Sequence, residues 1–170
     1  MASAEEQKGR REAWQKALKF LSARAHSAAE LRRKLRAHGF LEGDIDSVIE
    51  ELKARNYLND LDLSVFFIQG LIERKPYGRR WFLHKLLQRG IEKEIIEEAL
   101  DKAFADVSEL ELASRAIQSK LSSLEREDMR SKRVKLARFL SNRGFPEAMV
   151  LEITDLNLSD NSDRDDENST

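Results

Sequence analysis

The chain contains no cysteine, only two prolines and seven glycines, and no long apolar run. Without cysteine it forms neither disulfides nor thiolate zinc sites. Because glycine and proline supply most of the residues that β-turns require, their scarcity argues against a β-rich fold. The lack of a long apolar run argues against a membrane span, and we expect a cytoplasmic protein with no membrane partner.

Motifs for catalysis and for cofactor binding are also missing. The three histidines, His26, His38 and His84, do not have the three- or four-residue spacing of a metal site. Neither a glycine-rich phosphate loop nor a nucleophile-elbow motif occurs in the chain. We therefore expect no enzyme activity, no metal and no cofactor, and we interpret the histidines as residues beside helix caps or at the edge of the core.

Charge is abundant but unevenly distributed. Charged residues make up 36% of the chain, and the net charge is only −1. Six acidic residues and one arginine fall between Asp155 and Thr170, so this end carries −5 and the remainder about +4. Such a composition predicts that residues 157–170 form a disordered acidic tail. We interpret the tail as a solubilising end, with a weak intramolecular mimic of nucleic acid as the alternative.

Three stretches of the chain resemble one another. The segments ELRRKLRAHGF, WFLHKLLQRGI and KLARFLSNRGF align on Gly39, Gly90 and Gly144, which lie 51 and 54 residues apart. Apolar residues recur eight and four positions before each glycine, directly after it and six positions after it. Each glycine is predicted to end a helix in the left-handed conformation. These matches predict three related units.

Each unit is predicted to contain three helices, which gives an all-α fold of three tandem three-helix repeats. Capping boxes at Ser27 and Ser108 and an approximate box at Asn59 predict helix starts near Ala28, Ser108 and Asp60. Stacked repeats predict an elongated, curved molecule with a long surface rather than a deep pocket. The predicted segments are a flexible N-terminus over 1–10 and repeats over 11–58, 59–105 and 106–156. The predicted helices cover 11–25, 28–38, 43–55, 60–74, 78–89, 92–104, 108–125, 130–143 and 146–156.

Basic residues gather on the middle helix of each predicted repeat. In the first repeat, helical spacing places Leu31, Leu35 and His38 on the buried side and turns Arg33 and Arg36 outward. A recurring outward cation favours a strip that binds an anionic partner, and a merely solvated helix face is the alternative. The residues predicted for this strip are Arg32, Arg33, Arg36, Arg79, Arg80, Lys85, Arg89, Lys132, Arg133 and Lys135.

The second repeat is more apolar than the first. Trp81, Leu83 and Leu87 replace polar residues of the first repeat, which favours packing between repeats or, alternatively, an exposed stripe that binds protein. Tyr57 and Leu58 are predicted to fill the junction between the first and second repeats.

The segments ARAHSAAELRRKLRAHGF, RNYLNDLDL, KPYGRRWFLHKLLQRGI and KRVKLARFLSNRGF resemble the successive signatures of the RecX family, bacterial proteins that modulate the RecA recombinase. The resemblance spans residues 13–155. It implies three three-helix repeats that bind the active RecA filament on single-stranded DNA. It also implies restraint of strand exchange, ATP hydrolysis and stimulated self-cleavage of the SOS repressor. The matching positions, most of which we interpret as structural, are Ser27, Glu30, Leu31, Lys34, Leu35, Gly39, Tyr57, Leu58, Asp60, Gly78, Leu86, Gly90 and Ile91.

Two functions from different classes follow. The leading hypothesis is a monomeric, non-enzymatic regulator that binds the RecA filament, with weak direct contact to DNA as a further option. The alternative is a free-standing DNA-binding helical-repeat protein, because three-helix units with basic helices resemble helix-turn-helix modules. A helical scaffold for unrelated proteins is a third hypothesis. The effect of RecA and an ATP analogue on the affinity for single-stranded DNA separates the first two.

Overall fold

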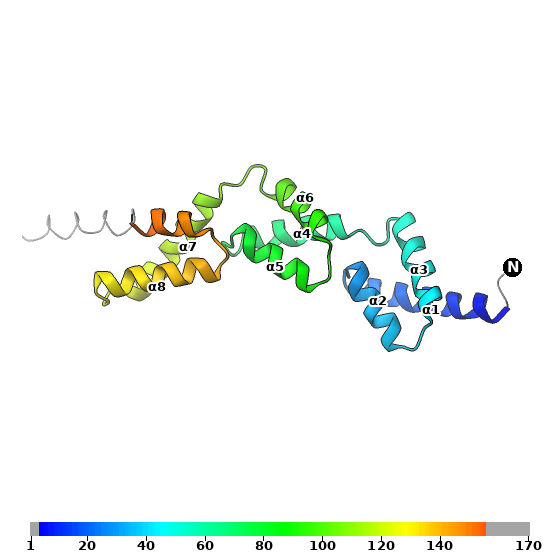
Figure 1. The fold of residues 1–170 in the computed structure, drawn as a ribbon. Helices are drawn as coiled ribbons and strands as arrows, with labels where there is room; N and C mark the ends of the chain where they lie inside the picture. Colours follow the sequence, from blue (N-terminus) through cyan, green and yellow to red (C-terminus); the bar gives the residue numbers. More distant parts are fainter. Residues whose placement is uncertain (1–3, 156–170) are drawn as a thin grey trace, which may run out of the picture. The chain divides into compact units, whose positions relative to one another are not determined.

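Helices make up the regular structure of the described part of the chain. The computed structural model describes residues 4–155, with side chains from residue 7 onward, and contains no strand within that range (Figure 1). This confirms the all-α prediction, while the predicted acidic tail over 157–170 lies outside the described residues. The helices are α1 (Ala4–Ala23), α2 (Ala28–Ala37), α3 (Glu42–Ala54), α4 (Asp60–Ile72), α5 (Arg79–Gln88), α6 (Lys93–Ala103), α7 (Glu109–Leu121) and α8 (Met129–Asn142). A short 3-10 turn, η1 (Ser122–Leu124), follows α7, and a last helix covers 147–155.

Helix α1 is longer than the sequence indicates. It begins at Ala4, whereas the sequence predicts that the first helix begins at residue 11. The guanidinium Nη2 of Arg10 lies 2.7 Å from the carboxylate Oε2 of Glu51 in α3. The first turns of α1 are rich in charged residues, and an apolar pattern therefore does not reveal them.

The chain divides into two compact units. Within the described residues, unit 1 comprises the chain up to Phe66 together with Lys85–Ala99, and unit 2 comprises Phe67–His84 together with the chain from Leu100 onward. Helices α4, α5 and α6 each continue from one unit into the other. The second predicted repeat therefore contributes residues to both units.

The core of unit 1 contains the apolar positions that recur in the sequence. Helices α1, α2 and α3 pack against one another. They enclose fully buried side chains that include Leu31, Leu35 and Ile45. The equivalent residues of the other two repeats, Phe82, Leu86, Ile96, Leu136, Leu140 and Val150, are also buried. The aligned apolar positions thus predict the core correctly.

The three repeat glycines adopt the conformation that the sequence predicts. Gly39, Gly90 and Gly144 have φ values of 84°, 77° and 80°, in the left-handed region. The residue after each glycine donates its backbone N–H to the carbonyl five positions earlier, as in a Schellman stop. Each middle helix therefore ends at a glycine, and its last carbonyls are partly satisfied by the turn.

In unit 1, the start of α2 meets the end of α5, and we call this contact the first joint. The hydroxyl of Ser27, which is the N-cap of α2, donates to the backbone carbonyl of Arg89 at 2.6 Å. The first helical amide, that of Ala28, donates to Oδ1 of Asp60 at 2.9 Å. Asp60 is the first residue of α4, and burial raises the pKa of its carboxyl group. Residues far apart in sequence thus satisfy the free polar groups at both helix ends.

Unit 2 contains the same arrangement one repeat later, between the start of α5 and the end of α8, and we call it the second joint. The amide of Gly78 donates to the carbonyl of Arg143 at 2.8 Å. The amide of Arg79 donates to Oε1 of Glu109 at 2.8 Å. Glu109 is the first residue of α7, as Asp60 is the first residue of α4. Both joints therefore use an acidic residue at the start of the following repeat to cap the middle helix of the preceding one.

The joints make two of the three repeat glycines necessary for a second reason. A Cβ added to Gly90 would lie 2.6 Å from Cβ of Ala29, and one added to Gly144 would overlap the backbone of Trp81. A Cβ on Gly39 would meet nothing within 4 Å. Gly39 is thus required only for its backbone conformation, whereas the other two also allow close approach of a neighbouring helix.

Two side chains that the sequence predicted to be buried are exposed in the structure. His38 is exposed, not buried as predicted, because it is the C-cap of α2 and its Nδ1 lies 2.9 Å from the carbonyl oxygen of Lys34. At the junction between the first and second repeats, Leu58 is buried as predicted, whereas Tyr57 is 58% exposed. Tyr57 lies beside Trp14 at the surface of unit 1.

Alanine substitution of the repeat glycines tests the joints. We expect Gly39→Ala to lower the free energy of unfolding by about 1 kcal/mol through backbone strain alone. Gly90→Ala and Gly144→Ala should cost about 2–4 kcal/mol, because overpacking at the joint adds to the strain. Urea denaturation of the three single variants measures the difference, and equal losses in all three would contradict the close approach at the joints.

Candidate functional site

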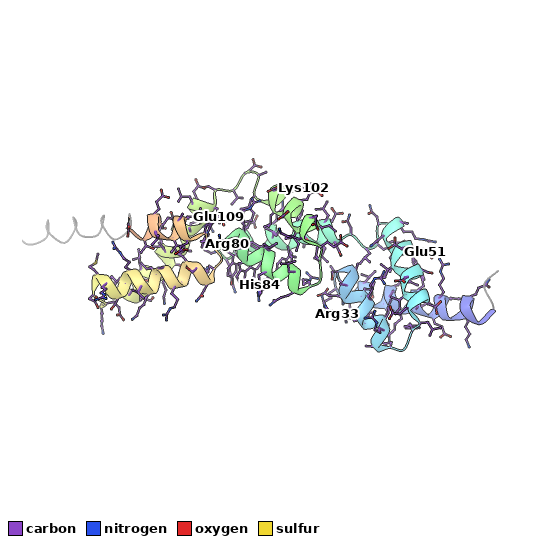
Figure 2. The ribbon with its side chains drawn as sticks, in the orientation of Figure 1. Arg33, Glu51, Arg80, His84, Lys102 and Glu109 are labelled. Atoms are coloured by element: carbon purple, nitrogen blue, oxygen red, sulfur yellow. The ribbon has the colours of Figure 1, made fainter. Side chains whose placement is uncertain are left out.

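Helix α2 presents one cation without a partner beside two that are paired. Arg33, labelled in Figure 2, is exposed, and no carboxylate of the described residues pairs with it. Arg32 forms an ion pair with Asp46 of α3. Nη2 of Arg36 donates to Oε2 of Glu42 at 2.9 Å, and this hydrogen bond lowers the pKa of Glu42. Arg33 is therefore the side chain in α2 best placed to meet an external anion.

Helix α5 repeats this division between paired and unpaired cations. Arg80, labelled in Figure 2, is exposed and has no partner among the described residues. Arg79 forms an ion pair with Asp101 of α6, and its guanidinium lies over the ring of Phe104 at 5.2 Å from the centroid. Lys85 is half-buried. In α5 the exposed cation without a partner is thus Arg80.

Helix α8 carries more positive charge than the other two middle helices. Its sequence, MRSKRVKLARFLSN, contains five basic residues and no acidic one. Arg133 pairs with Asp155 at 2.9 Å, and Lys135 pairs with Glu127. The half-buried Lys132 has no carboxylate partner in the described part of the chain. Two exposed arginines that the predicted strip does not include, Arg130 and Arg138, likewise have none.

Arg89 differs from the other residues of the predicted strip because it belongs to the first joint. Its Nη2 and Nε donate to the two carboxylate oxygens of Glu30 at 3.0 and 3.2 Å. The exposed fractions of the two side chains are only 21% and 14%. Burial opposes ionisation of Glu30, but hydrogen bonds from Arg89 and from the Ser27 amide outweigh it and lower the pKa of Glu30. Arg89 thus holds α5 against α2.

Several signature positions of the sequence meet at the first joint. Ser27 and Glu30 form the predicted capping box, in which the Glu30 amide donates to the Ser27 hydroxyl and the Ser27 amide donates to the Glu30 carboxylate. Asp60 and Gly90 complete the contact from the second repeat. Gly78 lies at the equivalent place in the second joint. The structure thus places these five residues where repeats meet rather than on a free surface.

His26 is buried and directly precedes Ser27, the N-cap residue of the first joint. Its Nδ1 lies 2.9 Å from the carbonyl oxygen of Arg24, and its Nε2 has no hydrogen-bond partner among the described residues. Burial lowers the pKa of His26.

No group of three or more metal-ligating side chains is found in the described part of the chain. No helix described here is long and apolar enough to span a membrane.

The apolar residues of the second repeat have different environments. The ring of Trp81 stacks on that of Tyr77, with centroids 3.9 Å apart, and meets Phe82 edge to face. Leu83 is half-buried, and Leu87 is 45% exposed. Trp81 is therefore a packing residue, which is the first of the two interpretations of this stripe. It lies beside Gly144 in the second joint.

Two arginines of the basic strip have acidic partners that the sequence did not reveal. Arg32 and Arg36 are four residues apart on α2, and their partners Asp46 and Glu42 are four residues apart on α3. Residues four apart lie on the same face of a helix. Two neighbouring helices that run in opposite directions can therefore pair two such residues on one helix with two on the other. The spacing of acidic residues on the following helix was thus the available signal.

Comparison with known proteins places the chain among regulatory proteins. Residues 13–52 match the family model for the first three-helix domain of RecX, and residues 59–100 match the model for the second. "Regulatory protein RecX" from Pelodictyon phaeoclathratiforme is 39% identical over 129 residues, which are 76% of this chain and 78% of the relative. "Regulatory protein RecX" from Chlorobaculum tepidum is 34% identical over 151 residues, 89% and 91% of the two chains.

Solved structures show the same fold at lower sequence identity. The crystal structure of RecX from Lactobacillus salivarius aligns with a TM-score of 0.78 at 21% identity, over 86% of this chain and 95% of that one. A second crystal structure, of a regulatory protein RecX, aligns with a TM-score of 0.79 at 19% identity, over 89% of this chain and 74% of that one.

Alanine substitution of two arginines separates joint residues from surface residues. Arg89→Ala removes two hydrogen bonds from the half-buried Glu30 carboxylate, and we expect it to lower the free energy of unfolding by about 1–2 kcal/mol. Arg36→Ala removes a solvent-exposed ion pair and should leave the stability unchanged, because water screens such pairs. Urea denaturation of both variants at one salt concentration is the measurement. If the two variants unfold at the same urea concentration, Arg89 does not stabilise the joint.

Proposed function

The protein belongs to the RecX family of regulatory proteins, and from this premise we propose that it regulates the RecA recombinase. In this proposal the chain binds the RecA filament on single-stranded DNA and restrains strand exchange, ATP hydrolysis and repressor cleavage. It does so by occupying the filament, without catalysis of its own. Family membership over most of the chain is the observation that carries the proposal.

The distribution of charge on the middle helices supports a contact with an anionic assembly. Arg33 on α2 and Arg80 on α5 are exposed and lack internal carboxylate partners. An unpaired cation loses no internal ion pair when it meets a phosphate or a carboxylate. Of the ten residues of the predicted strip, we therefore propose these two, together with Lys132, as the first contacts. Arg32, Arg36, Arg79, Arg133 and Lys135 would have to exchange an internal partner for an external one.

Charge at these positions acts mainly on encounter and orientation. Exposed cations raise the rate at which a negatively charged partner is met, and they contribute less to the final affinity. Several weak contacts in one chain add through effective concentration, because each bound repeat holds its neighbours near the partner. Charge on successive repeats therefore suits a partner that is itself repetitive and negatively charged.

Direct DNA binding without RecA is the second candidate. The five basic residues of α8, with no acidic residue in the same helix, favour it. Binding of this kind would depend steeply on salt, because phosphate contacts release counterions. Affinity for single-stranded DNA that is strong without RecA, and that does not rise when RecA and an ATP analogue are added, would support this candidate.

Charge reversal tests the proposed contacts. We expect the double variant Arg33→Glu, Arg80→Glu to need about tenfold more protein than the parent to inhibit the ATPase of RecA on single-stranded DNA, because it repels the filament. The matched control is Arg11→Glu, Arg74→Glu, which makes the same change in charge at two exposed, unpaired arginines outside the middle helices. The control should inhibit like the parent.

Three results would contradict the account. If the parent has no effect on the RecA ATPase, the proposed regulation is wrong. If both double variants weaken inhibition equally, net charge matters but the two named positions do not. If neither weakens it, the partner contacts another surface. The urea midpoint of each variant shows that the fold is intact.

A further inference from the structure

Helix α8 has an exposed face on which positive charge and an apolar side chain lie together. Arg130, Val134 and Arg138 are spaced four residues apart and so share one side of the helix. All three are exposed, and the exposed fraction of Val134 is 54%. Neither arginine has a carboxylate partner among the described residues. We call these three residues, with the adjacent Arg133, the α8 face.

The chain itself contains an acidic segment directly after the last described residue. Residues 156–170 contain five acidic residues and one arginine, and also Leu156 and Leu158. This segment is therefore net −4 and carries apolar side chains at its start. The α8 face offers the complementary features, since its charges are all positive and Val134 lies between two of them.

The described chain ends beside α8, at Asp155. The last helix, over 147–155, follows the Gly144 turn that ends α8, and its residue Asp155 pairs with Arg133 at 2.9 Å. The last helix therefore runs back along α8, toward the α8 N-terminus. Arg130 lies one turn before Arg133, and the next residues of the chain need to cover only that turn. Fifteen extended residues span up to about 50 Å, whereas the 14 residues of α8 measure about 21 Å.

The N-terminus of α8 adds to the attraction. The backbone dipoles of a helix place partial positive charge at its N-terminus, where acidic groups are stabilised. The side chain of Asp128 accepts from the amide of Ser131 and so uses one of the free amides there. Arg130, in the first turn, increases the positive potential at this end of the helix.

We propose that residues 156–170 bind the α8 face and thereby compete with external polyanions for it. Tethering gives the segment a high effective concentration, so weak individual contacts suffice. Screening by salt should release it, because the contacts are mainly between exposed charges. The proposal concerns only this chain and a polyanion, so it does not depend on whether RecA is the partner.

A spin label tests the contact directly in the full chain. The protein contains no cysteine, so Ser162→Cys provides a single attachment site for a nitroxide. At low salt we expect the amide signals of residues 129–138 to lose more than half of their intensity, while the signals of α2, whose Arg33 is an exposed and unpaired cation, keep theirs. The loss should disappear in 0.5 M salt and in the variant Arg130→Gln, Arg138→Gln. Absent broadening, or equal broadening of α2, would overturn the proposal.

Binding of a single-stranded oligonucleotide tests the competition. Replacing the acidic residues (Asp160→Asn, Asp163→Asn, Asp165→Asn, Asp166→Asn, Glu167→Gln) should raise the affinity about three- to tenfold at low salt, since the competing charge is gone. In the background of Arg130→Gln, Arg138→Gln the same replacements should have no effect. In the background of the matched control Arg11→Gln, Arg74→Gln the gain should persist. A gain of equal size in both backgrounds would show general repulsion and would overturn the proposed contact.

Discussion

The contact between the start of one middle helix and the glycine turn that ends the next is the constraint on which the other features depend. It joins α2 to α5 in unit 1 and α5 to α8 in unit 2. Each joint pairs a donor at a helix start with the carbonyl just before a glycine, and an acidic residue from the following repeat accepts a free amide of the same helix. Polar groups at helix ends that lack a partner are costly when buried, so the joint both places the repeats and satisfies their ends.

Some basic residues take part in the joints, and others do not. Arg89 and Arg143 lie just before the repeat glycines, and the joints use them: Arg89 binds Glu30, and Nη1 of Arg143 donates to the carbonyl of Pro76. Arg33 and Arg80 are exposed, and their side chains form no ion pair or hydrogen bond within either joint in the described part of the chain. The signature positions at the joints therefore report how the repeats connect, whereas the cations proposed as partner contacts lie elsewhere.

Local patterns in the sequence predicted the features of the fold that depend only on residues close together in the chain. The glycine register, the capping residues Ser27, Asn59 and Ser108, and the aligned core positions all follow from short-range geometry. The start of α1, the exposure of His38 and the acidic partners of Arg32 and Arg36 depend on which helices pack together. Helical periodicity identifies a buried face but not the residue that will lie opposite a given arginine. For this reason the sequence showed where cations recur on the middle helices, but not which of them are already paired.

Hydrogen exchange of the variant Ser27→Ala, compared with Ser108→Ala, tests most directly whether the joint couples the repeats. Both serines are N-caps whose side chains accept from the amide three residues on, but Ser27 also donates to Arg89. We expect Ser27→Ala to speed exchange in two separate segments, 27–31 and 88–92, and Ser108→Ala to speed it only near 108–112. If exchange in 88–92 stays at the parent rate when Ser27 is replaced, the joint does not couple α2 to α5 and the central claim is wrong.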